Sequence, residues 1–64
     1  MIVNFYASDH KPADGRMSEA EEYDSLDAVR ERARGLAVLW RCEWVSVYES
    51  GDREMLMQVD AEGN

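Results

Sequence analysis

Apolar and polar residues alternate in three short stretches of the chain, and a period of two is typical of β-strands. Residues 2–7, IVNFYA, are rich in β-branched and aromatic side chains and predict a first strand. Residues 44–49 and 53–59 alternate in the same way on either side of a predicted turn at 50–52, SGD. We therefore predict a β-hairpin in the C-terminal part of the chain.

A period close to 3.6 replaces this alternation after residue 25 and predicts an amphipathic helix. Either Asp24 or Ser25 can cap its start, and Asp27 places a carboxylate in the first turn. Gly35 either allows close approach to a sheet or marks an early end of the helix. The apolar stripe consists of Leu26, Val29, Ala33, Leu36, Ala37 and Trp40.

The segment between the first strand and the helix divides into two parts. Residues 8–16, SDHKPADGR, contain turn-forming residues and predict a loop. Residues 17–23, MSEAEEY, are too few for a convincing helix, so we interpret them as a second strand. This strand is expected to pair with the first as a hairpin, at an edge that its charges protect from further pairing.

These elements predict a single α+β domain over residues 1–64. The order is ββαββ, with one helix packed on one face of a four-stranded, mainly antiparallel sheet. Residues 60–64, DAEGN, are polar and are expected to form a flexible tail.

Both faces of this predicted sheet carry large apolar side chains. Alternation assigns Val3, Phe5, Val45 and Val47 to the helix side, with Leu56 as a further candidate. The opposite set is Ile2, Tyr6, Trp44, Tyr48, Met55 and Met57. A second apolar face of this kind is typical of a contact site, either for another copy of the chain or for a different protein. The alternatives are that the two faces are reversed or that long side chains cover the patch.

The charge of the chain indicates what kind of partner fits. There are 14 Asp and Glu residues against 7 Lys and Arg, a net charge of −7. Such a balance disfavours direct binding to nucleic acid or to an anionic membrane surface, because both depend on Lys and Arg. Residues 29–42 alone are basic, with one acid and four arginines. We therefore expect acids gathered around the strands and a basic protein partner; the alternative is that the negative charge serves only solubility.

The residue types of known catalytic and metal sites do not come together in this sequence. Cys42 is the only cysteine and His10 the only histidine, so we find no zinc pattern and no convincing catalytic pair. Cys42 is expected to be a small apolar residue at the join between helix and strand. We predict no enzyme activity, cofactor, metal or membrane segment. The single cysteine favours a reducing, cytoplasmic setting.

A small, cysteine-poor and strongly acidic domain of this kind resembles the phage-encoded anti-CRISPR proteins. The resemblance is one of composition and architecture over the whole chain, carried by SEAEEYDSLD (18–27) and YESGDREMLMQVDAE (48–62). It implies an inhibitory binding protein that acts as a DNA mimic in the host bacterial cell. Its target would be the nucleic-acid-binding surface of a CRISPR effector, with type I as the first choice. The arginine-rich helix departs from a uniformly acidic surface.

Two groups of residues are expected to contact the partner. The acidic group is Glu19, Glu21, Glu22, Asp52 and Glu54, and the aromatic group is Tyr6, Trp44 and Tyr48. The alternative function is a homodimerising accessory or structural domain that uses the aromatic face.

Overall fold

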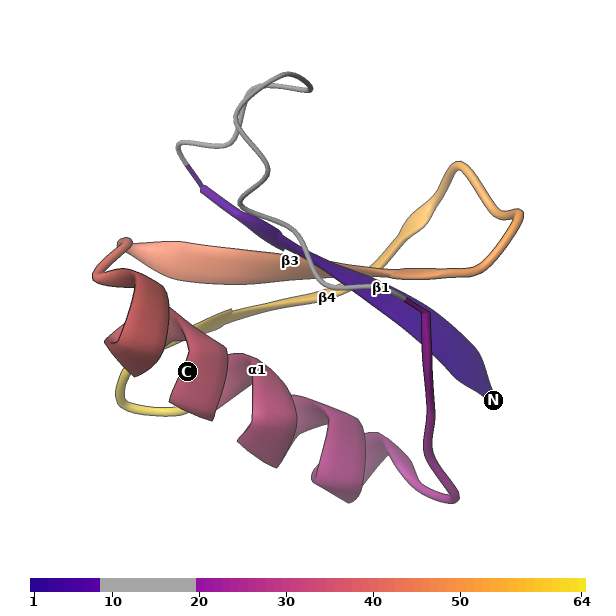
Figure 1. Cartoon of the computed structure of the whole chain (residues 1–64), viewed down its shortest axis with the longest axis horizontal. Helices are drawn as coiled ribbons and strands as arrows, with labels where there is room; N and C mark the ends of the chain where they lie inside the picture. Colours follow the sequence, from indigo (N-terminus) through magenta and orange to yellow (C-terminus); the bar gives the residue numbers. More distant parts are fainter. Residues whose placement is uncertain (9–19) are drawn as a thin grey trace.

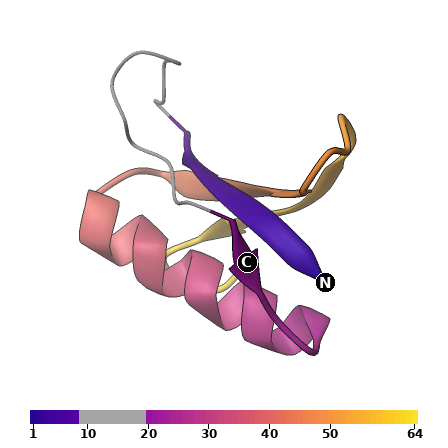
Figure 2. The ribbon, with the colours of Figure 1, turned by 45° about the vertical axis from the view of Figure 1, so that its right-hand side comes forward.

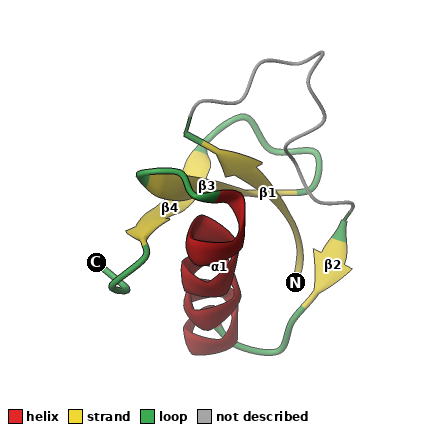
Figure 3. Ribbon diagram, turned by 60° about the vertical axis from the view of Figure 1, so that its left-hand side comes forward, coloured by secondary structure: helices red, strands yellow, loops and turns green. Residues whose placement is uncertain are grey.

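The fold is a four-stranded antiparallel sheet with one helix across one face, as the sequence predicts (Figures 1 and 3). The computed structural model describes residues 1–8 and 20–64. The elements are β1 (Ile2–Ala7), β2 (Glu21–Glu22), α1 (Leu26–Trp40), β3 (Trp44–Glu49) and β4 (Met55–Asp60). The strand order is β2-β1-β3-β4, so β2 and β4 are the edges.

Local interactions define both ends of α1. Ser25 has extended backbone angles, and its Oγ accepts a hydrogen bond from the backbone N–H of Ala28 at 3.1 Å, which makes it the N-cap. Of the two candidates in the sequence, Ser25 rather than Asp24 therefore caps the helix. The helix continues through Gly35 and ends at Arg41, which adopts the left-handed conformation with φ 54°. Gly35 therefore does not end the helix early, and a Cβ at this position would meet no atom of the sheet within 4 Å, so close approach to the sheet does not require this glycine either.

The hydrophobic core lies between α1 and the sheet. The helix contributes Val29, Ala33, Leu36 and Ala37, and the sheet contributes Val3, Phe5, Val45, Val47 and Val59. The predicted apolar stripe is therefore correct at its centre. The stripe is less well buried at its two ends, where Trp40 is only partly buried and Leu26 is 50% exposed.

A β-bulge in β4 changes which side chains face the helix. Val47 pairs with Met57, but the next residue of β3, Tyr48, pairs with Met55, so Leu56 is an extra residue on β4. Leu56 and Met57 both pack against the core as a result. The prediction that Met57 lies on the face away from the helix was wrong. Met55 does lie there, opposite Tyr48.

The two edge strands are shorter than the sequence predicts. Within residues 17–23, strand structure is present at Glu21–Glu22, which pairs antiparallel with β1 at the sheet edge. Residues 9–19, which include most of the predicted loop, lie outside the described part. β4 begins at Met55 rather than at residue 53. Asp52 accepts a hydrogen bond from the N–H of Glu54 at 3.0 Å, so these residues belong to the turn.

The C-terminal residues form a hydrogen-bonded turn beside α1 (Figure 1). The carboxylate of Asp60 accepts hydrogen bonds from the N–H groups of Glu62 and Asn64, at 2.8 and 3.0 Å. Arg30 donates to the carbonyl of Gly63 at 3.3 Å. Asp60, which the sequence assigns to the flexible tail, is instead the last residue of β4 and pairs with Trp44. The flexibility of residues 61–64 stays a prediction, and it would require these hydrogen bonds to break.

Candidate partner-binding surface

The sheet face turned away from α1 carries the aromatic residues that the sequence singles out. We call it the open face, and it comprises Asn4, Tyr6, Trp44, Ser46, Tyr48, Met55 and Gln58. The strand register places Tyr48 between Asn4 and Met55, and Ser46 between Tyr6 and Gln58. The rings of Tyr6 and Tyr48 touch edge to face, with centroids 5.5 Å apart and planes at 84°. Alternation therefore predicted the position of all three aromatic residues, and their contact with a partner stays a prediction.

A depression opens over the two tyrosines. The turn between β3 and β4 curves away from α1 and rises beside the open face (Figures 1 and 2). The open face and this turn line a solvent-open hollow of ≈ 520 Å³. Its floor includes Asn4, Tyr6, Ser46 and Tyr48, which are all half-buried, and its wall includes Glu49, Gly51, Asp52 and Arg53, which are all exposed. Gly51 has φ 85°, a conformation that a side chain would strain.

Three carboxylates gather at this turn. Glu49, Asp52 and Glu54 are exposed, and in the described part of the chain none of them forms an ion pair. We call these three residues the acidic rim. Arg53 lies among them and, within the same described residues, is also without an ion pair. The sequence predicted Asp52 and Glu54 as partner contacts but missed Arg53, because only the path of the turn brings it to the hollow.

Trp44 lies at the other end of β3 and lines a different, smaller hollow of ≈ 330 Å³. Ser8, Arg41, Cys42 and Glu43 line the same hollow. The thiol of Cys42 donates to the carbonyl of Trp44 at 3.2 Å, and the residue is partly buried where α1 meets β3. Cys42 therefore serves as a joining residue, as the sequence predicts. Trp44 does not share the tyrosine hollow.

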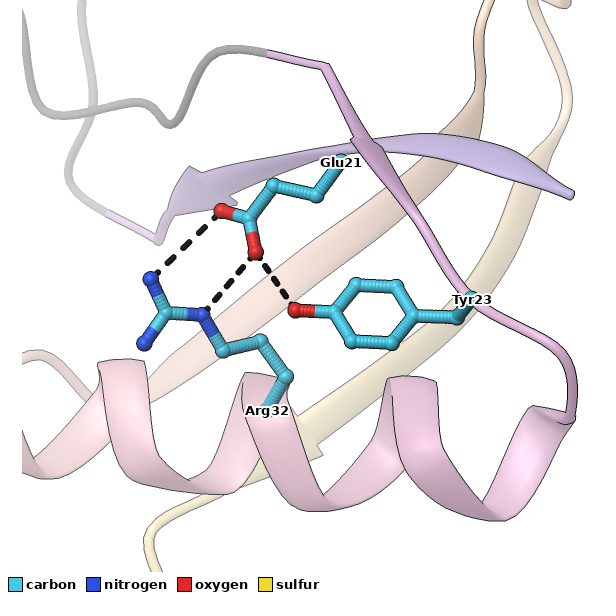
Figure 4. Close-up of polar contacts among 3 residues, drawn as sticks. All are labelled: Glu21, Tyr23 and Arg32. Carbon is cyan, nitrogen blue, oxygen red and sulfur yellow. Dashed lines mark hydrogen bonds and ion pairs between the residues drawn. The ribbon is translucent and has the colours of Figure 1, made fainter.

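The two acids of β2 have different surroundings, although they are neighbours in sequence. One carboxylate oxygen of Glu21 accepts hydrogen bonds from the hydroxyl of Tyr23 and from Nε of Arg32, the latter at 3.1 Å (Figure 4). Its other oxygen accepts from Nη2 of Arg32 at 3.5 Å. Glu22 is exposed, and among the residues described it has no ion pair. Glu19 and His10 lie outside the described residues.

Glu21 thus links β2 to α1. Burial raises the pKa of the Tyr23 hydroxyl, and the hydrogen bond to the Glu21 carboxylate raises it further. The same carboxylate raises the pKa of the Arg32 guanidinium by accepting its hydrogen bonds. The sequence predicts Glu21 as a partner contact, whereas the structure gives its carboxylate internal partners. This contact could not be predicted from a short sequence motif, because Glu21 and Arg32 are 11 residues apart.

The cationic groups of α1 are engaged on the helix side of the molecule. Arg34 binds Glu31 at 2.6 Å, and the neighbouring guanidinium lowers the pKa of the Glu31 carboxyl. Arg32 binds Glu21, and Arg30 binds the C-terminal turn. The arginines of α1 are thus engaged within the molecule, whereas the three acids of the rim have no ionic partner among the described residues.

The described residues also bear on metal and membrane binding. They contain no group of three or more His, Cys, Asp or Glu residues placed to hold a metal ion. They contain no helix with the length and apolar character that a membrane crossing needs.

Comparison of the chain with protein-family models, curated proteins and solved structures finds no match.

Proposed function

We propose that this chain is an inhibitory binding protein that covers a basic, nucleic-acid-binding surface of another protein. The observation that carries the proposal is the acidic rim beside the tyrosine hollow. Its three carboxylates have no ionic partner among the described residues, whereas Glu21 and Glu31 are each paired with an arginine of α1. Uncompensated charge next to aromatic side chains fits a surface that is completed by a cationic partner.

The physical basis is substitution of carboxylates for phosphates. A nucleic-acid-binding surface presents Lys and Arg at the spacing of phosphates, and each acid of the rim can pair with one of them. The tyrosines add contact area that excludes water, which strengthens those pairs and makes the contact specific. The basic outer side of α1 lies across the sheet from the rim and so faces away from a basic target.

The resemblance to anti-CRISPR proteins implies a class of target for this binding surface. A CRISPR effector, with type I as the first choice, binds its DNA in a positively charged channel. A domain of 26 × 26 × 17 Å is small enough to occupy part of such a channel. Glu22 extends the acidic surface at the other edge of the sheet. Glu21 contributes less to binding than the sequence predicts, because Arg32 and Tyr23 already hold its carboxylate.

A second candidate is a homodimer through the open face. The observation that favours it is the exposure of Met55, which is 47% accessible beside Tyr48. Sedimentation of the free protein separates the two functions, since a stable dimer whose seam contains Tyr48 would cover the rim and leave it unavailable to another protein.

The test of the proposed function is displacement of target DNA from a purified type I effector. We expect the protein to displace the DNA, with an affinity that falls as salt is added. Asp52→Lys and Glu54→Lys should each weaken displacement by about tenfold or more. Glu62→Lys is the matched control, because it makes the same charge change in the C-terminal turn, and it should have a much smaller effect. If Arg30→Glu or Arg34→Glu abolishes displacement while the rim variants retain it, the basic helix is the binding surface and acidic mimicry is wrong.

A further inference from the structure

The tyrosine hollow has a chemistry that distinguishes between cationic side chains. Tyr6 and Tyr48 both line the hollow and meet edge to face, so the edge of one ring covers one face of the other and leaves its second face outside this contact. A ring face attracts a cation, and a planar guanidinium can stack on it with more contact than an ammonium group. Both tyrosines are half-buried, which limits the water that would otherwise compete for this contact.

The polar groups of the hollow include several hydrogen-bond acceptors. Asn4 and Ser46 add a side-chain carbonyl and a hydroxyl to the floor, and Glu49 and Asp52 add two carboxylates to the wall. An arginine side chain carries five N–H donors and no acceptor, so it can use several of these groups at once. Lysine presents three donors on a single nitrogen. Its ammonium group therefore cannot stack as a plane on a tyrosine ring while it also donates to both carboxylates of the wall.

From this combination we propose that the hollow binds one arginine side chain of the partner protein. The inference rests on the proposed function and adds the residue type that the open face selects. The volume of ≈ 520 Å³ leaves room for a guanidinium together with the aliphatic stem behind it. The stem would pack on the tyrosine rings while the charged group reaches the carboxylates.

The positive charge of Arg53 makes it possible to test whether the hollow binds a cation or an anion. It lines the same wall as Asp52 and carries the charge that would repel a bound arginine. Among the described residues it has no ion pair that would neutralise this effect. Removing the Arg53 charge should therefore strengthen binding of a cation, whereas it would weaken binding of an anion.

The experiment is a titration of the full chain with N-acetyl-arginine amide, followed through the backbone amide shifts of Ser46 and Asp52. The expected result is saturable binding with a dissociation constant of about 1–10 mM, as for a single exposed side chain. N-acetyl-lysine amide should bind about threefold more weakly or worse, and N-acetyl-glutamine amide should not saturate. Asp52→Asn should weaken arginine binding about threefold and Arg53→Gln should strengthen it, while the control Glu62→Gln should leave it unchanged.

Two results would overturn the proposal. One is the absence of saturable shifts with the arginine probe. The other is loss of binding in Arg53→Gln together with saturation by N-acetyl-glutamate amide, which would make the hollow an anion site. Either result can occur while Asp52→Lys still impairs displacement of DNA, in which case only the arginine pocket is wrong. If displacement fails while the arginine probe binds, the proposed function is wrong and the hollow remains a guanidinium site.

Discussion

Glu21 and Glu22 are adjacent in β2, but only the first is held by other parts of the molecule. Glu21 accepts hydrogen bonds from Tyr23 and Arg32, whereas Glu22 is exposed. We predict that Glu21→Gln lowers the free energy of unfolding by up to about 1 kcal/mol, a modest value because Arg32 is 44% exposed and water screens the pair. Glu22→Gln should change it less. Urea denaturation of both variants is the measurement, and an equal or larger loss in Glu22→Gln would contradict the assignment.

Phe5 and Trp40 are both aromatic residues in contact with the core, but they differ in burial. Phe5 is fully buried and touches the ring of Tyr23 edge to face, with centroids 6.1 Å apart. Trp40 is only partly buried at the end of α1. Phe5→Ala should cost about 3–5 kcal/mol, and Trp40→Ala should cost distinctly less. In a domain this small the first loss can remove folding altogether.

The order of these two effects is the test. Circular dichroism and urea melts should show Trp40→Ala folded and cooperative under conditions in which Phe5→Ala has lost most or all of its structure. If Trp40→Ala unfolds and Phe5→Ala does not, α1 is packed differently at its end.

At the level of elements, periodicity predicts most of the fold because one face of each element is buried. Alternation identifies Val3 and Phe5 in β1 and Val45 and Val47 in β3, all of which are fully buried. The bulge at Leu56 lies beyond this reasoning, because it shifts the period by one residue and nothing in MLMQV marks it. The same limit applies to the candidate site. Alternation places Tyr6 and Tyr48 on the open face, but the approach of Arg53 depends on how the turn curves.

The bulge leads to a prediction about two methionines in β4. Met57 packs against the core, and Met55 lies on the open face. Met57→Lys should lower the free energy of unfolding by about 2 kcal/mol or more, because it brings a charge toward apolar side chains. Met55→Lys should leave the protein folded with a smaller change. Comparing their urea midpoints tests the register, and a greater loss in Met55→Lys would mean that β4 pairs without the bulge.

The C-terminal turn depends on one carboxylate. Hydrogen bonds from the N–H groups of Asn64 and Glu62 lower the pKa of Asp60 below its usual value. A carboxyl with a lowered pKa stabilises the fold at pH values above its unfolded pKa, and this contribution is lost as the pH falls through the folded pKa. We therefore expect Asp60→Ala at neutral pH to reproduce the effect of acid on the wild-type turn.

Amide hydrogen exchange of Glu62 and Asn64 measures this effect directly. Both amides should exchange faster in Asp60→Ala than in the wild-type protein, while Glu62→Gln, which leaves the accepting carboxylate in place, should not change the exchange of Asn64. Rapid exchange of both amides in the wild-type protein at neutral pH would instead support the flexible tail that the sequence predicts.

For the molecule as a whole, the distribution of charge matters more than any single pair. The net charge is −7, and the acids of the rim are exposed and uncompensated within the described residues. Within residues 1–8 and 20–64, the ion pairs are Arg32–Glu21 and Arg34–Glu31, which lie on the helix side and are partly or largely exposed. Exposed pairs contribute little, so repulsion among the acids should dominate the electrostatic free energy of folding. The surface that we propose for a cationic partner should therefore have a stability cost in the free protein.

Salt tests this balance, because it screens repulsion and attraction alike. The Debye length falls from about 30 Å at about 0.01 M to about 8 Å at about 0.15 M. With dimensions of 26 × 26 × 17 Å, most charges interact at the lower concentration and only neighbours interact at the higher one. We predict that the free energy of unfolding rises with added sodium chloride, by about 1 kcal/mol or less. Urea is the required denaturant because it is uncharged. Glu54→Gln, which removes one repelling charge, should show a smaller rise, and a fall in stability with salt would mean that the two helix-side ion pairs outweigh the repulsion.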